Sequence, residues 1–411
     1  MAAESNILNN IFGFGEDEQA LFTLPPIPQK TLTDVERLDW LRLSRSLNVG
    51  PITFTRLIAK FGSVQNSLEA LSTLSSKGGR KKYKTFSLED AEQEIEDISK
   101  IGARLIARCE PDYPQMLTEI EDAPPVITVL GNTSALQNKS FAIVGTRNAS
   151  INGRKMAQNI AKHVGEEGYM IASGLARGID TCVHEASLET GTIAVVAGGV
   201  DVVYPKENER LYHEIQENGV IVAESPFGTQ PQARHFPKRN RIISGISLGT
   251  LVVEASLKSG SLITARMTLE QNRELFAVPG SPMDPRSKGA NKLLKDGSAH
   301  LVTHAEDILD VLNTLRLTPL AEPASDFDMS GYETSLQDAS EDDTDALREN
   351  ICTLLDTTPV HVDELIRMSN ASVADVLSVL LELELAGRLE RHPGNKVNLI
   401  EDDSLSDETW D

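Results

Sequence analysis

From Phe141 onward, short runs rich in valine and isoleucine alternate with longer amphipathic stretches, and this alternation constrains the fold more than any other feature of the chain. The runs predict strands at 141–146, 169–173, 192–197, 220–224, 250–254, 275–278 and 300–302. The stretches between them predict helices at 154–166, 207–217 and 262–273, the last with Leu262, Ala265 and Leu269 on its buried face. Strand–helix repeats joined by right-handed crossovers predict an α/β domain, in which a doubly wound, mostly parallel sheet is covered by helices on both faces.

Composition and hydrophobic pattern divide the whole chain into expected domains, a linker and two terminal segments. The expected order is a flexible arm (1–34), a helical domain (35–104), the α/β domain (105–316), an acidic disordered linker (317–344), a winged helix (345–400) and an acidic tail (401–411). The three cysteines lie far apart, and we expect reduced thiols in a cytoplasmic protein. The N-terminus lacks a secretory pattern and no long apolar run occurs, so we expect no membrane segment.

The net charge of −22 argues against a nucleic-acid ligand, because phosphate repels an acidic surface. The acidic residues are unevenly distributed, however. Residues 322–344 hold eight of them and residues 401–411 hold six, without a single Lys or Arg in either stretch. Residues 140–310, in contrast, hold 18 Lys or Arg and 19 Asp or Glu. The objection therefore applies to the C-terminal third and not to the α/β domain.

Small residues follow nearly every expected strand: Gly145-Thr146, Ser173-Gly174, Gly198-Gly199, Ser225, Ser256 and Pro279-Gly280. Such turns let backbone N–H groups approach a phosphate, although tight turns also need glycine for steric reasons alone. The sequence lacks a dinucleotide fingerprint, a phosphate-binding P-loop, a nucleophile elbow and metal-spaced ligands. We therefore expect an anionic ligand, and we expect no catalytic residue, cofactor or metal.

A basic segment, 234–241, points to the kind of anion. It contains four Lys or Arg residues around Phe236, inside a stretch (225–253) without Asp or Glu. Cations that hold a backbone and an aromatic ring that stacks on a base, worth roughly 1–3 kcal/mol, suit single-stranded nucleic acid. A solvated basic turn at the start of a helix is the alternative.

Several motifs resemble the DNA-processing protein A family (DprA, also called Smf). They are Ala142–Arg147, Ser173–Asp180 with His184, Tyr204–Asn208, Glu224–Gly228, Phe236–Ser244 and Glu254–Arg266, in this order. The resemblance covers about residues 105–305. It implies an extended Rossmann-like domain that binds single-stranded DNA, forms homodimers and loads the RecA recombinase during natural transformation, with single-strand-binding protein as a further partner.

The resemblance also implies roles for individual residues. Arg147, Lys238, Arg239 and Arg241 would contact phosphates, and Phe236 would stack on a base. Backbone and hydroxyl donors would line the pocket at Ser173, Gly174, Asn240, Ser244, Gly260 and Ser261. We expect Glu254 to orient Arg147 or Arg239, and Asp180 and His184 to tie a helix start to its neighbouring loops.

The flanking modules allow two interpretations each. The segment 47–63 resembles a helix-hairpin-helix of the SAM-like N-terminal domain found in this family, but it could be a plain packing module. The basic loop 77–84 could assist DNA binding or only be solvated. The expected recognition helix carries Asp375, Glu382 and Glu384 and no Lys or Arg before Arg388. A helix that reads a DNA groove needs basic residues to contact the DNA, so this winged helix is expected to bind a protein or to have a regulatory role.

The main alternative function is enzymatic. Nucleotide-cleaving phosphoribohydrolases share a related Rossmann-like core, but they depend on a Pro-Gly-Gly-x-Gly-Thr motif followed by Glu, which this sequence lacks. A transcription regulator is disfavoured by the acidic recognition helix. The sequence thus favours a single-stranded-DNA-binding protein that is not an enzyme.

Overall fold

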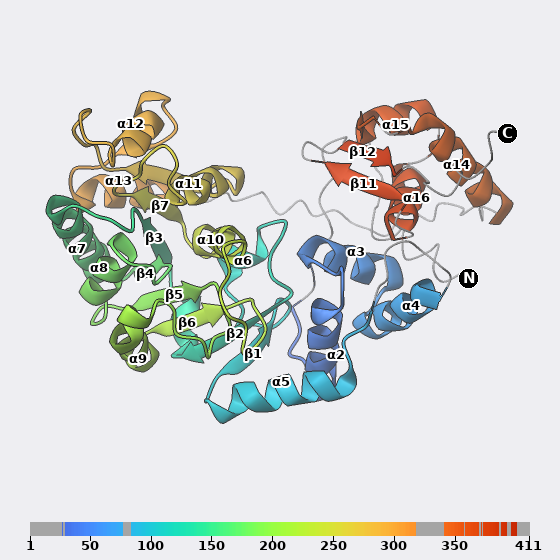
Figure 1. Ribbon diagram of the computed structural model, residues 1–411, viewed down its shortest axis with the longest axis horizontal. Helices are drawn as coiled ribbons and strands as arrows, with labels where there is room; N and C mark the ends of the chain where they lie inside the picture. The colour runs from blue at the N-terminus through green and yellow to red at the C-terminus, as the bar shows by residue number, and fades with distance from the viewer. Residues whose placement is uncertain are drawn as a thin grey trace, which may run out of the picture. The chain divides into compact units, whose positions relative to one another are not determined.

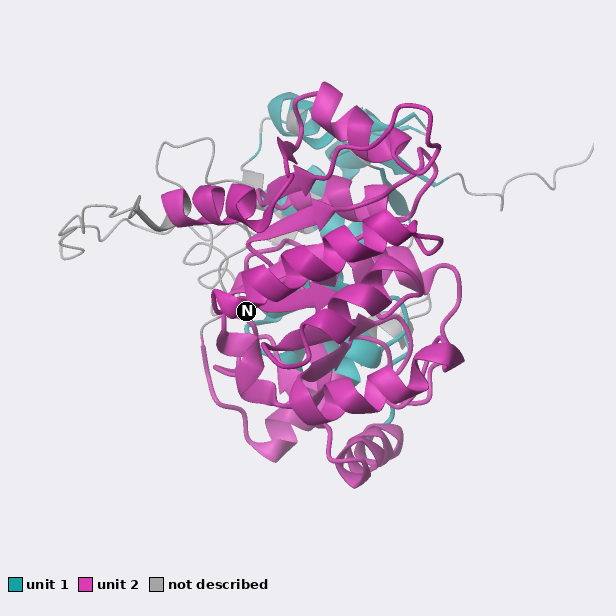
Figure 2. Cartoon of the chain, turned by 90° about the vertical axis from the view of Figure 1, so that its left-hand side faces the viewer, with its two compact units in different colours: residues 1–26, 42–87, 326–411 teal, residues 27–41, 88–325 magenta. Residues whose placement is uncertain are grey.

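The structure, a computed structural model, describes residues 27, 29–76, 84–317, 341–356, 358–369, 371, 373–385, 388–392 and 396–400. The chain forms two compact units (Figure 2). We call residues 27–41 and 88–325 the sheet unit, and residues 1–26, 42–87 and 326–411 the helical unit. The expected acidic tail, and most of the expected arm, basic loop and acidic linker, lie outside the described residues.

The sheet unit is built on a nine-stranded sheet of order β1-β2-β6-β5-β4-β3-β7-β8-β9 (Figure 1). Strands β3 to β9 are parallel, whereas β2 pairs antiparallel with β6 and β1 antiparallel with β2. The chain moves outward from β3 to β6 in one direction, then crosses back and continues from β7 to β9 in the other. Ligands of such sheets bind beside this reversal, at the carboxyl ends of the strands. The strands are β1 (Arg104–Ala107), β2 (Val126–Gly131), β3 (Ser140–Val144), β4 (Met170–Ser173), β5 (Thr192–Val196), β6 (Val220–Ala223), β7 (Gly249–Val252), β8 (Glu274–Ala277) and β9 (His300–Leu301).

Helices pack on both faces of the sheet because successive strand side chains point to opposite sides. In β3, Phe141 and Ile143 join a core with α7, α8 and α13, whereas Ala142 and Val144 join a core with α6, α10, α11 and α12. The helices of this unit after β1 are α6 (Gln115–Thr118), α7 (Ile151–Glu166), α8 (Ile179–Ala186), α9 (Glu209–Asn218), α10 (His235–Gly245), α11 (Ser261–Glu270), α12 (Lys288–Lys295) and α13 (Ala305–Leu317). The predicted doubly wound α/β class is therefore confirmed.

All seven expected strands are present, but two features differ from expectation. The antiparallel strands β1 and β2 were not predicted, and they extend the sheet at its β6 edge. The buried face of α11 was predicted wrongly, since Leu269 is 43% exposed. Thr264, Ala265 and Thr268 are buried instead, and the Thr268 hydroxyl donates a hydrogen bond of 2.8 Å to Thr250 Oγ1 of β7. A hydrogen-bonded threonine replaces the apolar residue that the periodicity indicated.

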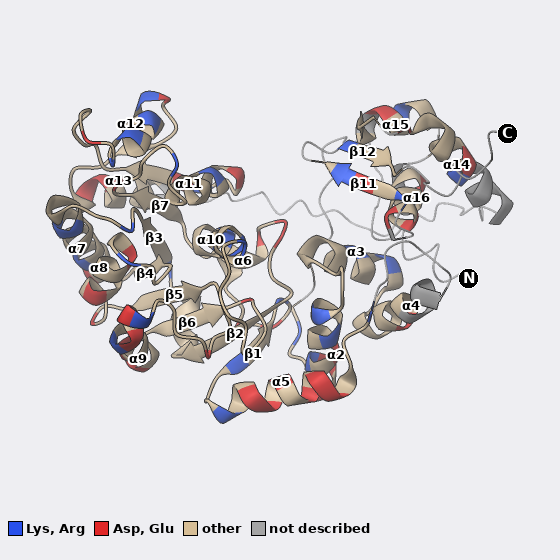
Figure 3. Cartoon of the chain, viewed as in Figure 1, with Lys and Arg blue, Asp and Glu red and all other residues tan. Residues whose placement is uncertain are grey.

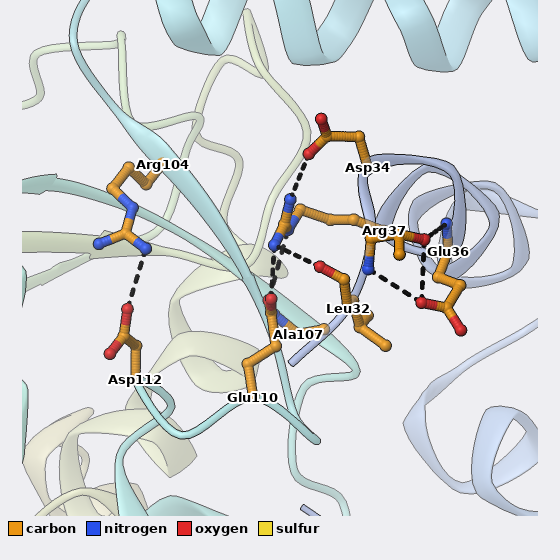
Figure 4. Close-up of polar contacts among 9 residues, drawn as sticks. Leu32, Asp34, Glu36, Arg37, Arg104, Ala107, Glu110 and Asp112 are labelled. Atoms are coloured by element: carbon orange, nitrogen blue, oxygen red, sulfur yellow. Dashed lines mark hydrogen bonds and ion pairs between the residues drawn. The ribbon is translucent and has the colours of Figure 1, made fainter. Parts of the chain in front are cut away.

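The segment before the sheet is anchored to the end of β1 by ion pairs (Figure 4). Arg37, in α2 (Asp34–Arg45), donates from Nη2 to Glu110 Oε1 at 2.6 Å and pairs with Asp34 at 2.9 Å. Glu110 also accepts from the backbone N–H of Ala107 in β1, at 2.9 Å. Thr33 and Glu36 exchange hydrogen bonds as a capping box, which fixes the start of α2. The other helix of this part is α5 (Leu88–Lys100).

The helical unit contains two helices after α2 and a winged helix. The first part holds α3 (Pro51–Phe61) and α4 (Val64–Ser76). The winged helix is made of α14 (Glu341–Leu354), α15 (Val362–Ser369) and α16 (Val373–Leu385), with an antiparallel sheet of order β10-β12-β11, formed by β10 (Val360–His361), β11 (Leu389–His392) and β12 (Lys396–Leu399). Its core includes Ile351, Leu365, Val376 and Leu380, all with no exposed surface. The predicted helical N-terminal domain and C-terminal winged helix are both confirmed. In the described part of the chain, no helix has the length and apolarity needed to cross a bilayer.

Candidate nucleic-acid interface

A cavity of about 320 Å³ lies where the carboxyl ends of β3, β4 and β5 meet the first half of α10. This is the strand-end rim that the sequence predicted, beside the reversal of strand order. We call it the rim pocket. Its lining is formed by Arg147, Asn148, Gly174, Ala176, Arg177, Val196, Ala197, Gly198, Val202, Tyr204, Pro205, Pro231, Phe236 and Arg239.

Arg239 lines this pocket with a guanidinium that is buried and incompletely paired. The residue is only 6% exposed, and its Nε and Nη1 atoms have no hydrogen-bond partner among the described residues. Burial lowers the pKa of Arg239 to about 10, with Arg147 adding to the shift and Asp180 opposing it. The side chain stays cationic at neutral pH. A buried cation with unpaired N–H groups is unfavourable by itself, so the pocket suits an anionic ligand.

Two glycines allow the close packing that positions the cations. A Cβ atom at Gly174 would lie 1.6 Å from Nη1 of Arg239, so only glycine leaves room for this guanidinium. Gly178 has φ +84°, and a Cβ there would lie 2.4 Å from the carbonyl oxygen of Thr146 and 2.6 Å from that of Arg147. The turn after β4 thus supports the loop that carries Arg147.

Arg147, Phe236 and Tyr204 contact one another around the pocket. The Arg147 guanidinium lies over the Phe236 ring, 5.1 Å from its centroid, in cation–π geometry. The Tyr204 ring contacts Phe236 with a centroid distance of 5.7 Å and an interplanar angle of 56°. Tyr204 is 46% exposed and Arg147 is also exposed, so both are open to solvent. The group offers aromatic faces and a cation next to each other.

Asp180 and His184 connect the start of α8 to the neighbouring turn and strand by hydrogen bonds, as predicted. Asp180 accepts from the backbone N–H of Ala176 at 3.3 Å. Burial raises its pKa, and the charge of Arg239 opposes that rise. His184 Nε2 accepts from the N–H of Leu175 at 3.3 Å, and Nδ1 lies 2.7 Å from the Thr192 hydroxyl. Burial, with the charge of Arg239, lowers the pKa of His184 to about 3, so the imidazole is neutral. Both side chains are occupied in holding the β4–α8 turn.

Helix α10 divides the predicted cations between two environments. Arg241 is 4% exposed, and its guanidinium pairs with Glu224 at 2.6 Å and with Asp122 at 3.3 Å. Lys238 is exposed and pairs with Glu224 at 3.3 Å. The structure therefore brings Arg147, Arg239 and Phe236 together, whereas Arg241 forms an internal ion pair outside the pocket lining.

The predicted hydroxyl and amide donors are also divided. Ser173 and Ser244 are fully buried, and the Ser173 hydroxyl donates to the carbonyl of Ile143 at 2.7 Å. Asn240 contacts the carbonyl of Gly260 at 3.4 Å, and Ser261 shares a hydrogen bond of 2.6 Å with Ser259. These four residues and Gly260 do not line the rim pocket, and of the donor set only Gly174 does.

The expected role of Glu254 is corrected by the structure. Its carboxylate accepts from the backbone N–H of Ser150 at 2.9 Å and from the Ser150 hydroxyl at 2.6 Å. Ser150 in turn caps α7 by accepting from the N–H of Gly153. Glu254 therefore holds the start of α7 and does not orient Arg147 or Arg239.

The sequence did not identify several lining residues, among them Asn148, Arg177 and Tyr204. Asn148 directly follows Arg147, and Arg177 lies three residues after Gly174, so adjacency to predicted residues was an available signal. Tyr204 comes from a separate loop, and only the fold brings its ring to Phe236. The described side chains include no group of three or more His, Cys, Asp or Glu that could hold a metal ion.

Three family models match the chain. The model of DNA recombination-mediator protein A matches residues 104–313, which form most of the sheet unit. The model of a DprA-like N-terminal HHH domain matches residues 34–96, and that of a DprA winged helix domain matches residues 336–395.

Individual relatives agree with these matches. The chain is 37% identical to Protein Smf of Escherichia coli (strain K12) over 322 residues, which cover 77% of this chain and 83% of that protein. It is 44% identical to DNA processing protein DprA of Streptococcus pneumoniae over 226 residues, covering 54% and 78%. The X-ray structure of DprA from Streptococcus pneumoniae superposes with a TM-score of 0.56 and 33% identity, covering 68% of this chain and 98% of that one.

Proposed function

This chain belongs to the DNA recombination-mediator protein A family (DprA/Smf), and from that premise we propose that it binds single-stranded DNA at the rim pocket. The observation that carries the proposal is Arg239, a buried guanidinium with unpaired N–H groups in the pocket. Beside it, Arg147 rests on the Phe236 ring. Together they supply what one nucleotide needs, namely cations for its phosphate and a ring for its base.

The chemistry of the pocket favours single strands over duplexes. A base can stack on Phe236 or Tyr204 only if its own face is free, and the bases of a duplex are stacked on one another. Stacking on a ring does not depend on the identity of the base, so we propose binding with little sequence preference. The two guanidinium groups add charge-assisted hydrogen bonds to the backbone, and this contribution weakens with salt.

We propose that the pocket binds without catalysis. Asp180 and His184 are a buried acid and a buried base on which the charge of Arg239 acts, and both are engaged in holding the β4–α8 turn. The alternative is a phosphoribohydrolase, which would release the free base from a nucleoside monophosphate. Incubation with nucleoside monophosphates, followed by chromatography of the bases, separates the two proposals. Turnover that is lost in Asp180→Asn would favour the enzyme.

The binding proposal is tested by fluorescence anisotropy with labelled single- and double-stranded oligonucleotides at several salt concentrations. We expect Arg147→Ala to weaken single-strand binding and to lower the slope of log affinity against log salt. Arg210→Ala is the matched control, because Arg210 is an exposed arginine on α9 whose side chain pairs with Glu214 one turn along the same helix. Equal affinities for the two variants would refute binding at the rim pocket.

On the same premise we propose that the protein protects incoming single strands in the cytoplasm and loads RecA recombinase during natural transformation and recombination. We propose that it acts as a homodimer and meets strands already covered by single-strand-binding protein. The test is the DNA-dependent ATP hydrolysis of RecA on pre-coated strands. A loader accelerates the appearance of this activity, and the acceleration should vanish in the Arg147→Ala, Lys238→Ala variant. A wild-type protein that only slows RecA at every ratio would leave a protective role without loading.

A further inference from the structure

Helix α16, the expected recognition helix of the winged helix, contacts α3 of the N-terminal part through ion pairs. Glu382 Oε1 lies 3.1 Å from Nζ of Lys60, and Glu384 Oε2 lies 3.5 Å from Nη1 of Arg56. All four side chains are between 18% and 33% exposed. Both helices belong to the helical unit, and Figure 3 shows basic residues on α3 and acidic residues on α16. The contact therefore joins segments that are far apart in the sequence.

The two carboxylates of α16 are each held from a second side. Glu382 also pairs with Arg348 of α14 at 2.8 Å, and Glu384 with Arg391 of β11 at 2.9 Å. Although burial alone would raise the pKa of Glu382, the charges of Lys60 and Arg348 hold it below its usual value. The winged helix thus presents two fixed negative charges in the direction of α3. Each carboxylate is held in position by an ion pair within the winged helix itself.

The surface of α3 that these carboxylates occupy is suited to phosphates. Arg56 and Lys60 are the only charged residues of α3, and a spacing of four puts them on one side of the helix. Their side chains start about one helical turn, roughly 5.4 Å, apart. Two cations so placed can each contact a separate phosphate of a strand that runs along the helix. The two glutamates of α16 fill the same two positions with carboxylate oxygens.

We propose that the Arg56–Lys60 side of α3 is a second contact surface for the backbone of single-stranded DNA, and that α16 occupies it in the DNA-free protein. The winged helix then does not read DNA. It competes with the DNA backbone for α3 through Glu382 and Glu384, and a bound strand displaces it. The kind of ligand rests on the proposed function, whereas the docking of α16 on α3 does not.

Zero-length carbodiimide crosslinking of the full chain tests both parts, because it adds no spacer and so joins an amine to a carboxylate only where the two groups come into direct contact. Peptide mass spectrometry should find Lys60 joined to Glu382 in the free protein. A single-stranded oligonucleotide of tens of nucleotides should abolish this crosslink. Its absence from the free protein would refute the docking. A crosslink that persists at saturating DNA would refute the competition while leaving binding at the rim pocket unaffected.

A pair of variants tests the consequence for affinity. Glu382→Gln, Glu384→Gln removes both charges with little change in shape, so Arg56 and Lys60 lose their ion pairs with α16. We expect several-fold tighter single-strand binding at low salt and a salt slope steeper by about 1.4, since each phosphate contact contributes roughly 0.7. Adding Arg56→Ala and Lys60→Ala should cancel both changes.

The matched control is Glu349→Gln, Glu364→Gln, which removes the same charge from exposed positions of the same winged helix. If the control tightens binding as much as Glu382→Gln, Glu384→Gln, the effect is general electrostatics and the proposal is wrong. If no variant or wild-type protein binds single strands at all, the proposed function fails, and the crosslink in the free protein still decides whether α16 docks on α3.

Discussion

Replacing Arg147 and Phe236 by alanine, singly and together, should reveal that they act on a bound strand as one unit. The guanidinium lies 5.1 Å from the centroid of the ring, so Phe236 holds Arg147 in place before DNA arrives. Phe236→Ala should cost about 1–3 kcal/mol of binding free energy through lost stacking. Arg147→Ala should cost about 1.5–3 kcal/mol through a lost charge-assisted hydrogen bond. Because the ring also orients the cation, the double variant should lose less than the sum of the two.

The exposure of the pair sets the difference between the loss in the double variant and the sum of the two single losses. A cation–π contact at an exposed site is worth about 0.5–1 kcal/mol, and Arg147 is exposed. The coupling energy in the double-mutant cycle should therefore be about 0.5–1 kcal/mol. The salt dependence separates the two roles. Arg147→Ala should reduce the slope by about 0.7, so that its defect shrinks about 2.6-fold between roughly 50 and 200 mM salt. Phe236→Ala should leave the slope unchanged, because stacking releases no counterions.

The cycle is measured by anisotropy of a labelled single strand, with all four proteins compared at each of several salt concentrations. Thermal unfolding of each variant verifies that the fold is retained. If the binding free energies lost by the two single variants add up to that lost by the double variant within about 0.3 kcal/mol, the contact between guanidinium and ring has no role in binding. An unaltered slope in Arg147→Ala would show that this cation does not meet the backbone.

Other predictions concern the pocket, the ion pairs and the ends of the chain. Gly174→Ala should reduce single-strand affinity roughly tenfold or more, because the added methyl displaces the buried guanidinium beside it, and anisotropy measures the loss. Arg241→Ala should lower the free energy of unfolding by about 3 kcal/mol in chemical denaturation, because it breaks a buried ion pair with Glu224, and protein that remains folded should bind normally. Deleting 401–411 should tighten binding slightly at low salt and have no effect at high salt, where charges are screened. Folding lowers the pKa of His184, so the neutral imidazole contributes to stability above about pH 6.5, and this contribution declines as the pH falls towards about 3. His184→Gln should therefore reduce the dependence of the free energy of unfolding on pH in this range, as measured by urea unfolding.

Strand–helix periodicity was sufficient to predict the parallel part of the sheet, because most of those strands are short buried runs of mainly apolar residues and stand out in the sequence. It was not sufficient for β1 and β2, which lie in a proline-containing stretch; β2 owes its place to pairing with β6, and β1 to pairing with β2. Composition also located the basic segment that forms the first part of α10. It could not tell which cations of that segment face a ligand, because neighbouring residues on a helix point in different directions. Arg239 reaches the pocket, whereas Arg241, two residues later, is turned into an ion pair with Glu224.

Contacts between residues far apart in the chain also could not be predicted from the sequence. The contact of Glu254 with Ser150 joins the ends of two adjacent strands that are far apart in the chain, and no local pattern indicates it. The same holds for Tyr204 beside Phe236. Asp180 and His184 were assigned correctly because their partners lie within one short turn and its neighbouring strand.

The position of β2 has a consequence for how the chain reaches its fold during synthesis. Its hydrogen-bonding partner, β6, leaves the ribosome only after β3, α7, β4, α8, β5 and α9 have been made. Until then the antiparallel pair β1–β2 exposes the edge of β2 that later binds β6, and such an unpaired edge is a template for wrong pairing with other chains. Non-local pairing of this kind forms late in folding. A nascent or truncated chain that ends before Val220 therefore keeps this edge open, and such fragments should aggregate, whereas chains extended through Ala223 can cover it.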